Sequence, residues 1–252
     1  MTVVAPSPPS RPIRLAIIIL LGTVVIGFAH WGRSVWVPLK NRLVGKKTTA
    51  EVMASLRRRR PELATMLPPQ GRDLTLLVLK RERLVELWAD EVRFAVYPMT
   101  AFSGTLGPKR REGDGQIPEG FYRPVFLNPN SAYHLSIKLD YPNADDRENG
   151  RREQRSSLGG NIFIHGKAVS IGCIAIGDPG IEAVFYAVGR VGMDHTRVII
   201  APYDMRGGRR TDLERGRVPW VIARYDRLAA ALAAFRERKR VAPPEEENRI
   251  RR

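Results

Sequence analysis

Residues 165–173, HGKAVSIGC, combine the only cysteine of this 252-residue chain with one of its four histidines. A thiol attacks as its thiolate, and a free thiol with a pKa of about 8.5 is only a few per cent ionised at neutral pH. A neighbouring imidazole raises that fraction by taking the proton and holding an ion pair. If residues 167–170 turn back, Cys173 returns to within hydrogen-bond reach of His165. The spacing predicts a cysteine nucleophile with a histidine base; the alternative is a strand-end histidine beside a small buried cysteine.

Small residues around the cysteine suit the same chemistry. Gly172 lets the backbone approach closely, and the Cys173 N–H with a neighbouring amide could bind the oxyanion of an acyl intermediate. Asp178 is expected to cap the following helix rather than act as a catalytic acid. We expect no metal and no cofactor, because there is no second cysteine and the histidines do not have ligand spacing.

Short apolar segments separated by Gly and Pro must position this pair. Residues 74–90 predict a hairpin around a basic turn, and residues 161–166 predict a strand that ends at the histidine. Residues 103–120 and 143–160 are polar and are expected to be loops. The pattern predicts a mostly β (α+β) fold, a sandwich or open barrel with peripheral helices. The other expected strands are 92–102, 121–129, 132–142 and 196–204, and the expected helices are 48–66 with a break at Pro61, 181–191 and 220–240.

The N-terminal segment has the composition of an export or membrane signal. Residues 15–31 contain no Asp, Glu, Lys or Arg and follow a polar, proline-rich lead. A membrane helix needs about 17–25 apolar residues, and a signal-peptide core about 7–15. We expect an uncleaved transmembrane anchor, with a cleaved signal or a buried helix as the alternatives. The expected organisation is a cytoplasmic lead (1–14), this segment (15–31), a basic linker and helix (32–70), a catalytic domain (71–210), a C-terminal helix (211–240) and a disordered tail (241–252).

The chain is strongly basic, with 42 Lys and Arg against 26 Asp and Glu and a formal net charge of +16. A field of this sign attracts polyanions such as nucleic acid, acidic lipid or an anionic cell-wall polymer. The sequence has no zinc-finger spacing, RNP-like aromatic stretch or clear helix-turn-helix, so nucleic acid is not an expected partner. A single cysteine also excludes an intramolecular disulfide.

The HGKAVSIGC stretch resembles the active-site motif of L,D-transpeptidase (YkuD-type) catalytic domains, in which an H-G pair precedes S-x-G-C. Its compact spacing is similar to the YafK-type branch of that family. Residues 109–124, KRREGDGQIPEGFYRP, resemble the family's G-D-x-x-T-P-E-G segment, with Ile117 where threonine is usual. Residues 133–146, YHLSIKLDYPNADD, resemble the L-S-x-x-x-x-Y-P-N-x-x-D segment of the branch. The similarity runs from about residue 74 to residue 204.

The resemblance implies a β-rich domain that acts on peptidoglycan stem peptides. Cys173 would form a thioester with the carbonyl of a tetrapeptide donor, and His165 would be the general base and later the general acid. The acceptor would be the side-chain amine of a diaminopimelate, or water. The further residues implied are Gly166, Ser170 and Gly172 in the turn and oxyanion site, and Tyr141, Asn143 and Lys167 in substrate binding.

Two positions depart from the wider family, which usually reads S-H-G-C followed by an apolar residue and arginine. Ile171 replaces the second histidine, and Ala175 stands where that arginine would be. YafK-type proteins share these departures, and some look like hydrolases that cut a diaminopimelate-linked protein from the wall. We therefore expect an inner-membrane-anchored acyltransferase with its catalytic domain in the periplasm. The alternatives are a cysteine amidase or endopeptidase, whose partner would be a wall-linked protein, and a non-catalytic wall-binding module.

Overall fold

The computed structural model describes residues 39 and 42 and the ranges 45–66 and 72–236. The expected anchor or signal segment (15–31) and the expected tail (241–252) lie outside these residues. Within the described ranges, no helix is both long and apolar enough to cross a bilayer.

Five strands form the larger sheet, in the order β3-β2-β1-β9-β4. Its central strand β1 is buried along its whole length because side chains alternate between two covered faces. Leu76 and Val78 belong to the main core, whereas Leu77 and Leu79 pack in a second core with the C-terminal helix α8. The bounds are β1 Leu74–Leu79, β2 Leu84–Ala89, β3 Val92–Pro98, β4 Gly120–Tyr122, β9 Thr196–Ala201 and α8 Pro219–Leu232.

Four shorter strands form a second sheet in the order β5-β6-β7-β8. The strands are β5 Pro124–Asn128, β6 Ser136–Leu139, β7 Phe163–His165 and β8 Ile174–Ala175. β7 and β8 run parallel, although only residues 166–173 join them. This connection is shorter than a usual parallel crossover, and it carries the HGKAVSIGC motif.

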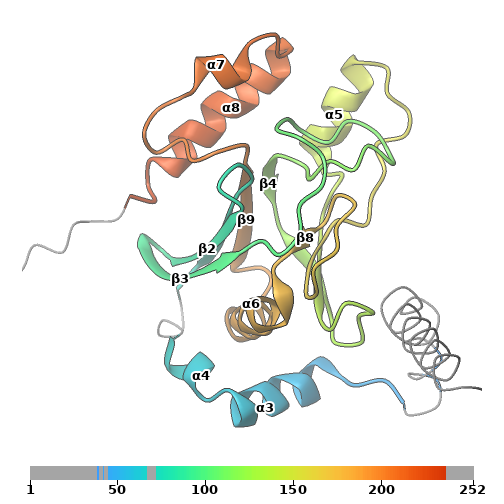
Figure 1. Ribbon diagram of the computed structural model, residues 1–252, viewed down its shortest axis with the longest axis vertical. Coiled ribbons are helices and arrows are strands. Elements are labelled where there is room, and N and C mark those ends of the chain that lie inside the picture. Colours follow the sequence, from blue (N-terminus) through green and yellow to red (C-terminus); the bar gives the residue numbers. More distant parts are fainter. Residues whose placement is uncertain (1–38, 40–41, 43–44, 67–71, 237–252) are drawn as a thin grey trace, which may run out of the picture.

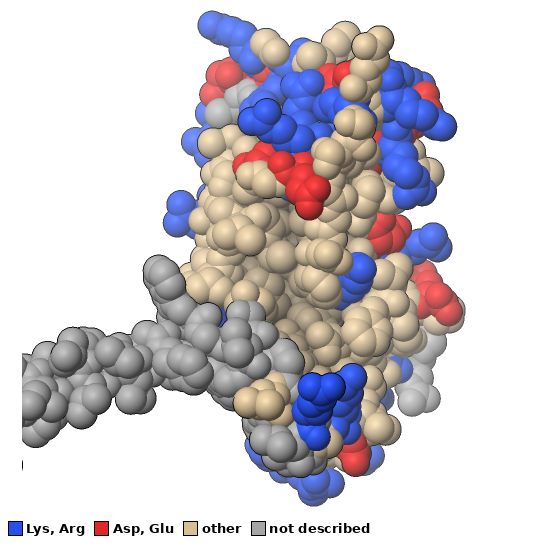
Figure 2. Space-filling model, turned by 90° about the vertical axis from the view of Figure 1, so that its right-hand side faces the viewer, with Lys and Arg blue, Asp and Glu red and all other residues tan. Residues whose placement is uncertain are grey.

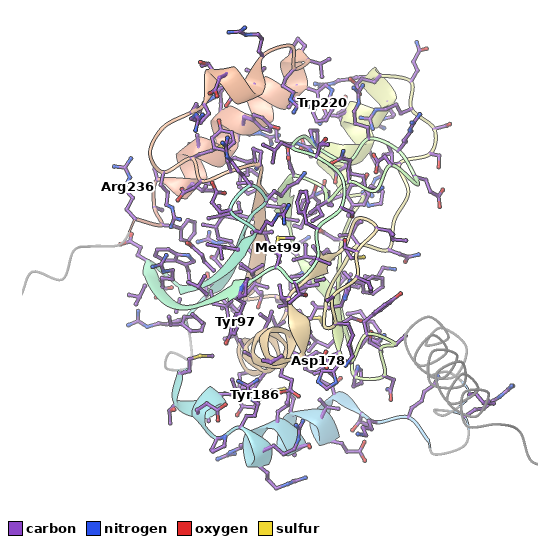
Figure 3. All side chains as sticks on the ribbon, in the orientation of Figure 1. Tyr97, Met99, Asp178, Tyr186, Trp220 and Arg236 are labelled. Carbon is purple, nitrogen blue, oxygen red and sulfur yellow. The ribbon has the colours of Figure 1, made fainter. Side chains whose placement is uncertain are left out.

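Helix α6, Gly177–Val191, lies inside the domain, so the expectation that all helices are peripheral is wrong for it. Its residues from Gly180 to Val188 are all buried, and it packs against β1, β6 and β7. The helices α3, Thr49–Arg59, and α4, Glu62–Met66, cover its other side (Figure 1). Tyr186 of α6 points toward α3 (Figure 3). α7, Thr211–Glu214, and α8 lie at the opposite end of the molecule (Figure 1).

The expected strands are present, and the result is a mixed α+β fold with two sheets. Residues 121–129 hold parts of two strands, β4 and β5, which belong to different sheets. The expected polar loop 143–160 contains a helix, α5 Ala144–Arg152. A capping box starts α5, because Asn143 Oδ1 accepts from Asp146 N and Asp146 Oδ2 accepts from Asn143 N. This capping signal outweighs the poor apolar pattern of the segment.

Candidate active site

The register of β7 and β8 brings the two candidate catalytic residues to one face of the second sheet. Ile164 is paired with Ile174, and both are fully buried in the main core. Cys173 precedes Ile174 and is therefore level with Phe163, whose side chain shares a face with that of His165. Phe163, His165 and Cys173 all line one pocket of about 710 Å³. The structure thus brings together the pair that the sequence predicts.

The two reactive side chains share the pocket without a direct hydrogen bond. They are offset by two residues on adjacent strands, which corresponds to roughly 8 Å between their Cα atoms. The Cys173 thiol instead donates to the Asn161 carbonyl, at 3.7 Å from Sγ to the oxygen. The resting arrangement therefore places the acid and the base near each other but not yet in contact, as in many free enzymes.

The geometry around His165 selects one tautomer of its ring. Nδ1 lies 2.6 Å from the Gly166 carbonyl oxygen, which can only accept, so Nδ1 carries the proton. Nε2 then has the free lone pair that a general base needs. The Tyr133 ring covers the imidazole, with 4.8 Å between ring centroids. Burial lowers the pKa of His165, although the Gly166 hydrogen bond opposes this effect, so the imidazole is neutral at neutral pH.

The environment of Cys173 favours the neutral thiol. Burial raises its pKa, and a backbone hydrogen bond from Phe163 and the charge of Lys109 only partly offset that effect. Burial also lowers the pKa of His165. The raised pKa of the thiol and the lowered pKa of the imidazole both oppose the thiolate–imidazolium pair that the sequence predicts for the resting site. The arrangement suits a thiol that loses its proton to Nε2 only as it attacks.

Ser170 and Gly172 shape the turn before the cysteine. Ser170 Oγ donates to the Cys173 carbonyl at 2.7 Å and accepts from the Gly172 N–H at 3.2 Å. Gly172 has a φ of +123° that L side chains rarely adopt, and a Cβ there would lie 3.0 Å from the Gln116 carbonyl oxygen. Since the Gly172 N–H is already used, the Cys173 N–H is the better candidate for an oxyanion donor.

Gly166 has no space for a side chain, because a Cβ would lie 2.6 Å from Asp178 Oδ1. Asp178 does not cap α6, contrary to expectation: the N-cap position is Ile176, and no side chain caps it. Asp178 lies at the start of α6 (Figure 3), accepts from the Lys167 N–H at 3.0 Å and pairs with Lys167 Nζ. Lys167 therefore anchors its loop to α6 and does not line the pocket.

Tyr141 and Asn143 also lie outside the residues that line this pocket. Tyr141 is buried, and its hydroxyl donates to the Leu158 carbonyl at 2.9 Å. Asn143 caps α5, and its Nδ2 donates to the Phe121 carbonyl at 2.8 Å. Both side chains support the neighbouring loop, and their predicted role in substrate binding stays a prediction.

Several residues that the sequence analysis did not single out line the pocket, among them Lys109, Tyr133 and Asn161. Lys109 and Tyr133 begin two of the stretches that carry the family resemblance, but they precede the motif letters, which start at Gly113 and Leu135, so motif position did not single them out. Asn161 has a φ of +54° and opens the residues that lead into β7. In the part of the chain that the structure describes, no three His, Cys, Asp or Glu side chains are grouped to hold a metal ion.

Comparison with known proteins identifies the family. Residues 73–200 match the model of the YkuD family, the L,D-transpeptidase catalytic domain. The chain belongs to this family. It is 35% identical over 144 residues to the Escherichia coli (strain K12) protein named "Putative L,D-transpeptidase YafK", covering 54% of this chain and 56% of that protein. The chain thus spans about half the length of the curated relatives it matches.

Two solved structures are more distant matches. The helical cell shape determining protein Pgp2 from Campylobacter jejuni is 22% identical, with a TM-score of 0.42, over 55% of this chain and 53% of that chain. An L,D-transpeptidase from Xylanimonas cellulosilytica is 12% identical, with a TM-score of 0.35, over 53% of this chain and 63% of that chain.

Proposed function

We propose that this protein is a cysteine acyltransferase that acts on peptidoglycan stem peptides, with Cys173 as nucleophile and His165 as general base. The main observation behind this proposal is that Cys173 and His165 line the same pocket. The Gly166 carbonyl accepts the Nδ1 proton of His165, which leaves Nε2 unprotonated. A wall-binding module has no need of this arrangement. Membership of the YkuD family supports the same reading.

In the first half-reaction, the Cys173 proton moves to His165 Nε2 and Sγ attacks the carbonyl carbon of the donor peptide bond. The Cys173 N–H stabilises the resulting oxyanion. When the intermediate collapses, the C–N bond breaks and His165 returns the proton to the leaving amine. A thioester on Cys173 remains.

In the second half-reaction, an acceptor attacks the thioester and gives its proton to His165, and the thiol is then restored. An amine acceptor, such as the side chain of a diaminopimelate, forms a new peptide bond. Water releases the stem as a free carboxylate; if the amine that left in the first half-reaction belongs to a wall-linked protein, that protein is already freed at that step. The same residues serve both outcomes, so the acceptor decides between transpeptidation and hydrolysis.

The proposed setting is the cell envelope, with residues 15–31 as an inner-membrane anchor and the catalytic domain in the periplasm. The charge distribution supports contact with an anionic polymer. Figure 2 shows Lys and Arg gathered toward both ends of one face, with a largely uncharged band between them. We expect binding to isolated wall to weaken with added salt, because screening shortens the range of such attraction.

The test is mass spectrometry of muropeptides after incubation of purified sacculi with the full chain or its Cys173→Ala variant. New diaminopimelate-to-diaminopimelate cross-links that require Cys173 would establish a transpeptidase. Cross-links or attached peptides that disappear only with Cys173 present would establish a hydrolase. Identical muropeptides with both proteins would contradict the proposal and favour a wall-binding module.

A further inference from the structure

Lys109 is a buried cation at the edge of the catalytic pocket, with one hydrogen-bond donor to spare. Its side chain is only 5% exposed, and Nζ donates to the Arg111 carbonyl at 2.9 Å and to Asp114 Oδ1 at 2.7 Å. An ammonium group has three N–H donors. Among the described residues, partners are found for two of them. The third remains available to a ligand in the pocket that Lys109 lines.

Asp114 fixes the position of the Lys109 ammonium, and its own carboxylate has other hydrogen-bond donors besides this cation. Its carboxylate also accepts from the backbone N–H groups of Arg110, Arg111 and Gln116, at 2.8, 3.0 and 3.0 Å. The loop therefore satisfies Asp114 largely through the backbone. A fixed ammonium of this kind is preorganised and does not lose side-chain freedom when it binds an anion.

The charged residues that line the pocket indicate what kind of anion it suits. Lys109 is the only Lys or Arg, and Glu112 the only Asp or Glu, among the described residues that line the pocket. Glu112 is exposed, and its Oε2 accepts from Ser157 Oγ at 3.0 Å. The Lys109 ammonium is already paired with Asp114, and Glu112 adds an exposed carboxylate, so the pocket suits a monoanion better than a doubly charged phosphate, whose second negative charge would have no partner.

Gly159 packs closely against Lys109 and Glu112, and only a residue without a side chain fits there. A Cβ at this position would lie 3.1 Å from Glu112 Cα and 3.4 Å from Lys109 Cε. Gly159 and Cys173 line the same pocket, so a ligand group at Lys109 is continuous with the reacting thiol. The charge of Lys109 also reaches the sulfur, where it favours ionisation.

We propose that Lys109 forms a carboxylate subsite, which binds a free carboxylate of the peptide whose neighbouring carbonyl meets Cys173. This inference rests on the proposed acyl-transfer site and adds a specificity determinant to it. It predicts that the protein selects peptides with an underivatised carboxylate over the same peptides as carboxamides.

The first test compares alkylation of the full chain by iodoacetate, an anion, and by iodoacetamide, its neutral isostere. The iodoacetate-to-iodoacetamide rate ratio should fall about tenfold in Lys109→Gln, the typical effect of one charge-assisted hydrogen bond. Arg111→Gln is the matched control: it removes an equal charge two residues away, from a side chain that is exposed and does not line this pocket. An equal fall in both variants, or no fall in Lys109→Gln, would overturn the subsite.

The second test needs neither a variant nor a reactive thiol. Calorimetry of the unsubstituted full chain would compare an N-acetylated dipeptide ending in a free carboxylate with the same dipeptide ending in a carboxamide. We expect about tenfold weaker binding of the carboxamide at a fixed salt concentration. Equal affinities would refute the inference even if Lys109→Gln failed to fold.

Failure of this inference can be separated from failure of the proposed function. Turnover of sacculi without any carboxylate preference would remove the subsite and leave the acyltransferase. A carboxylate preference without turnover would remove the acyltransferase and leave an anion-binding pocket.

Discussion

Replacing His165 by Asn separates the two roles that an imidazole could have at this site. The Asn amide can occupy the position of Nδ1 and still donate to the Gly166 carbonyl, which accepts from Nδ1 at 2.6 Å. It has no atom in the position of Nε2, so the general base is lost. Loss of a positioned base typically lowers a rate by about 10²–10⁴-fold, or about 3–5 kcal/mol of activation free energy.

The same variant should have little effect on the pKa of the thiol. The Cys173 thiol donates a hydrogen bond to the Asn161 carbonyl and makes none with the imidazole. Burial is the main reason why the pKa of Cys173 is raised. We therefore expect the pH midpoint of iodoacetamide alkylation to move by less than about half a pH unit, which is under about 0.7 kcal/mol. Turnover of sacculi should fall by about 10²–10⁴-fold in the same variant.

The assay is the alkylation rate of Cys173 against pH, measured beside muropeptide turnover for both proteins. His195→Asn is the matched control, because His195 is an exposed histidine outside the pocket; it should change neither quantity. A rise of more than about one pH unit in the alkylation midpoint of His165→Asn would show that a thiolate–imidazolium pair exists at rest. The conclusion that His165 and Cys173 are both neutral in the resting site would then be wrong.

Further predictions concern the sulfur, its turn and the contact between α3 and α6. Cys173→Ala should abolish turnover and leave the melting temperature within a few degrees, since the sulfur makes only weak hydrogen bonds, with the Asn161 carbonyl and the Phe163 backbone; loss of the fold in circular dichroism would contradict this. Ser170→Ala removes two hydrogen bonds of the turn and one with Ser103 Oγ, and it should cost about 1–2 kcal/mol of unfolding free energy in urea titrations; an unchanged midpoint would show that the turn holds without them. Glu182→Gln should cost about 1–2 kcal/mol at pH 7, because Glu182 joins Arg60 and His134 at 3.2 and 2.9 Å. Burial raises the pKa of Glu182, but these partners lower it overall, so its contribution is present above the unfolded pKa and is lost as pH falls through the folded value. The stability difference between Glu182→Gln and the unsubstituted protein should therefore shrink below about pH 4, and a difference that persists at pH 2 would refute the ion-pair explanation.

Much of the architecture could be predicted because its signals are local. Runs of branched apolar residues around a basic turn identified β1 and β2, alternation identified β7, and those strands are present. α5 was missed because its apolar pattern is weak and its stability comes from a capping box and from contacts distant in sequence. The ion pair between Asp145 and Arg224 of α8, at 2.6 Å, is one such contact.

The depth of α6 likewise depends on its neighbours. The sequence shows an amphipathic helix, but α3 and α4 cover the side that a peripheral helix would leave in water. The substrate-binding roles predicted for Tyr141, Asn143 and Lys167 came from motif position alone. Each of these side chains has a structural partner outside the pocket, which no spacing rule reveals.

The sequence by itself identified the candidate pair, since a single cysteine eight residues after an H-G histidine in an ordered set of motifs leaves few alternatives. Only the tertiary structure decided the protonation states of that pair and the cation beside it. Ionisation depends on burial and on groups brought together from distant parts of the chain. Thus Gly166 orients the histidine proton, burial keeps the thiol neutral, and Lys109 enters the pocket from a loop more than 50 residues before the histidine.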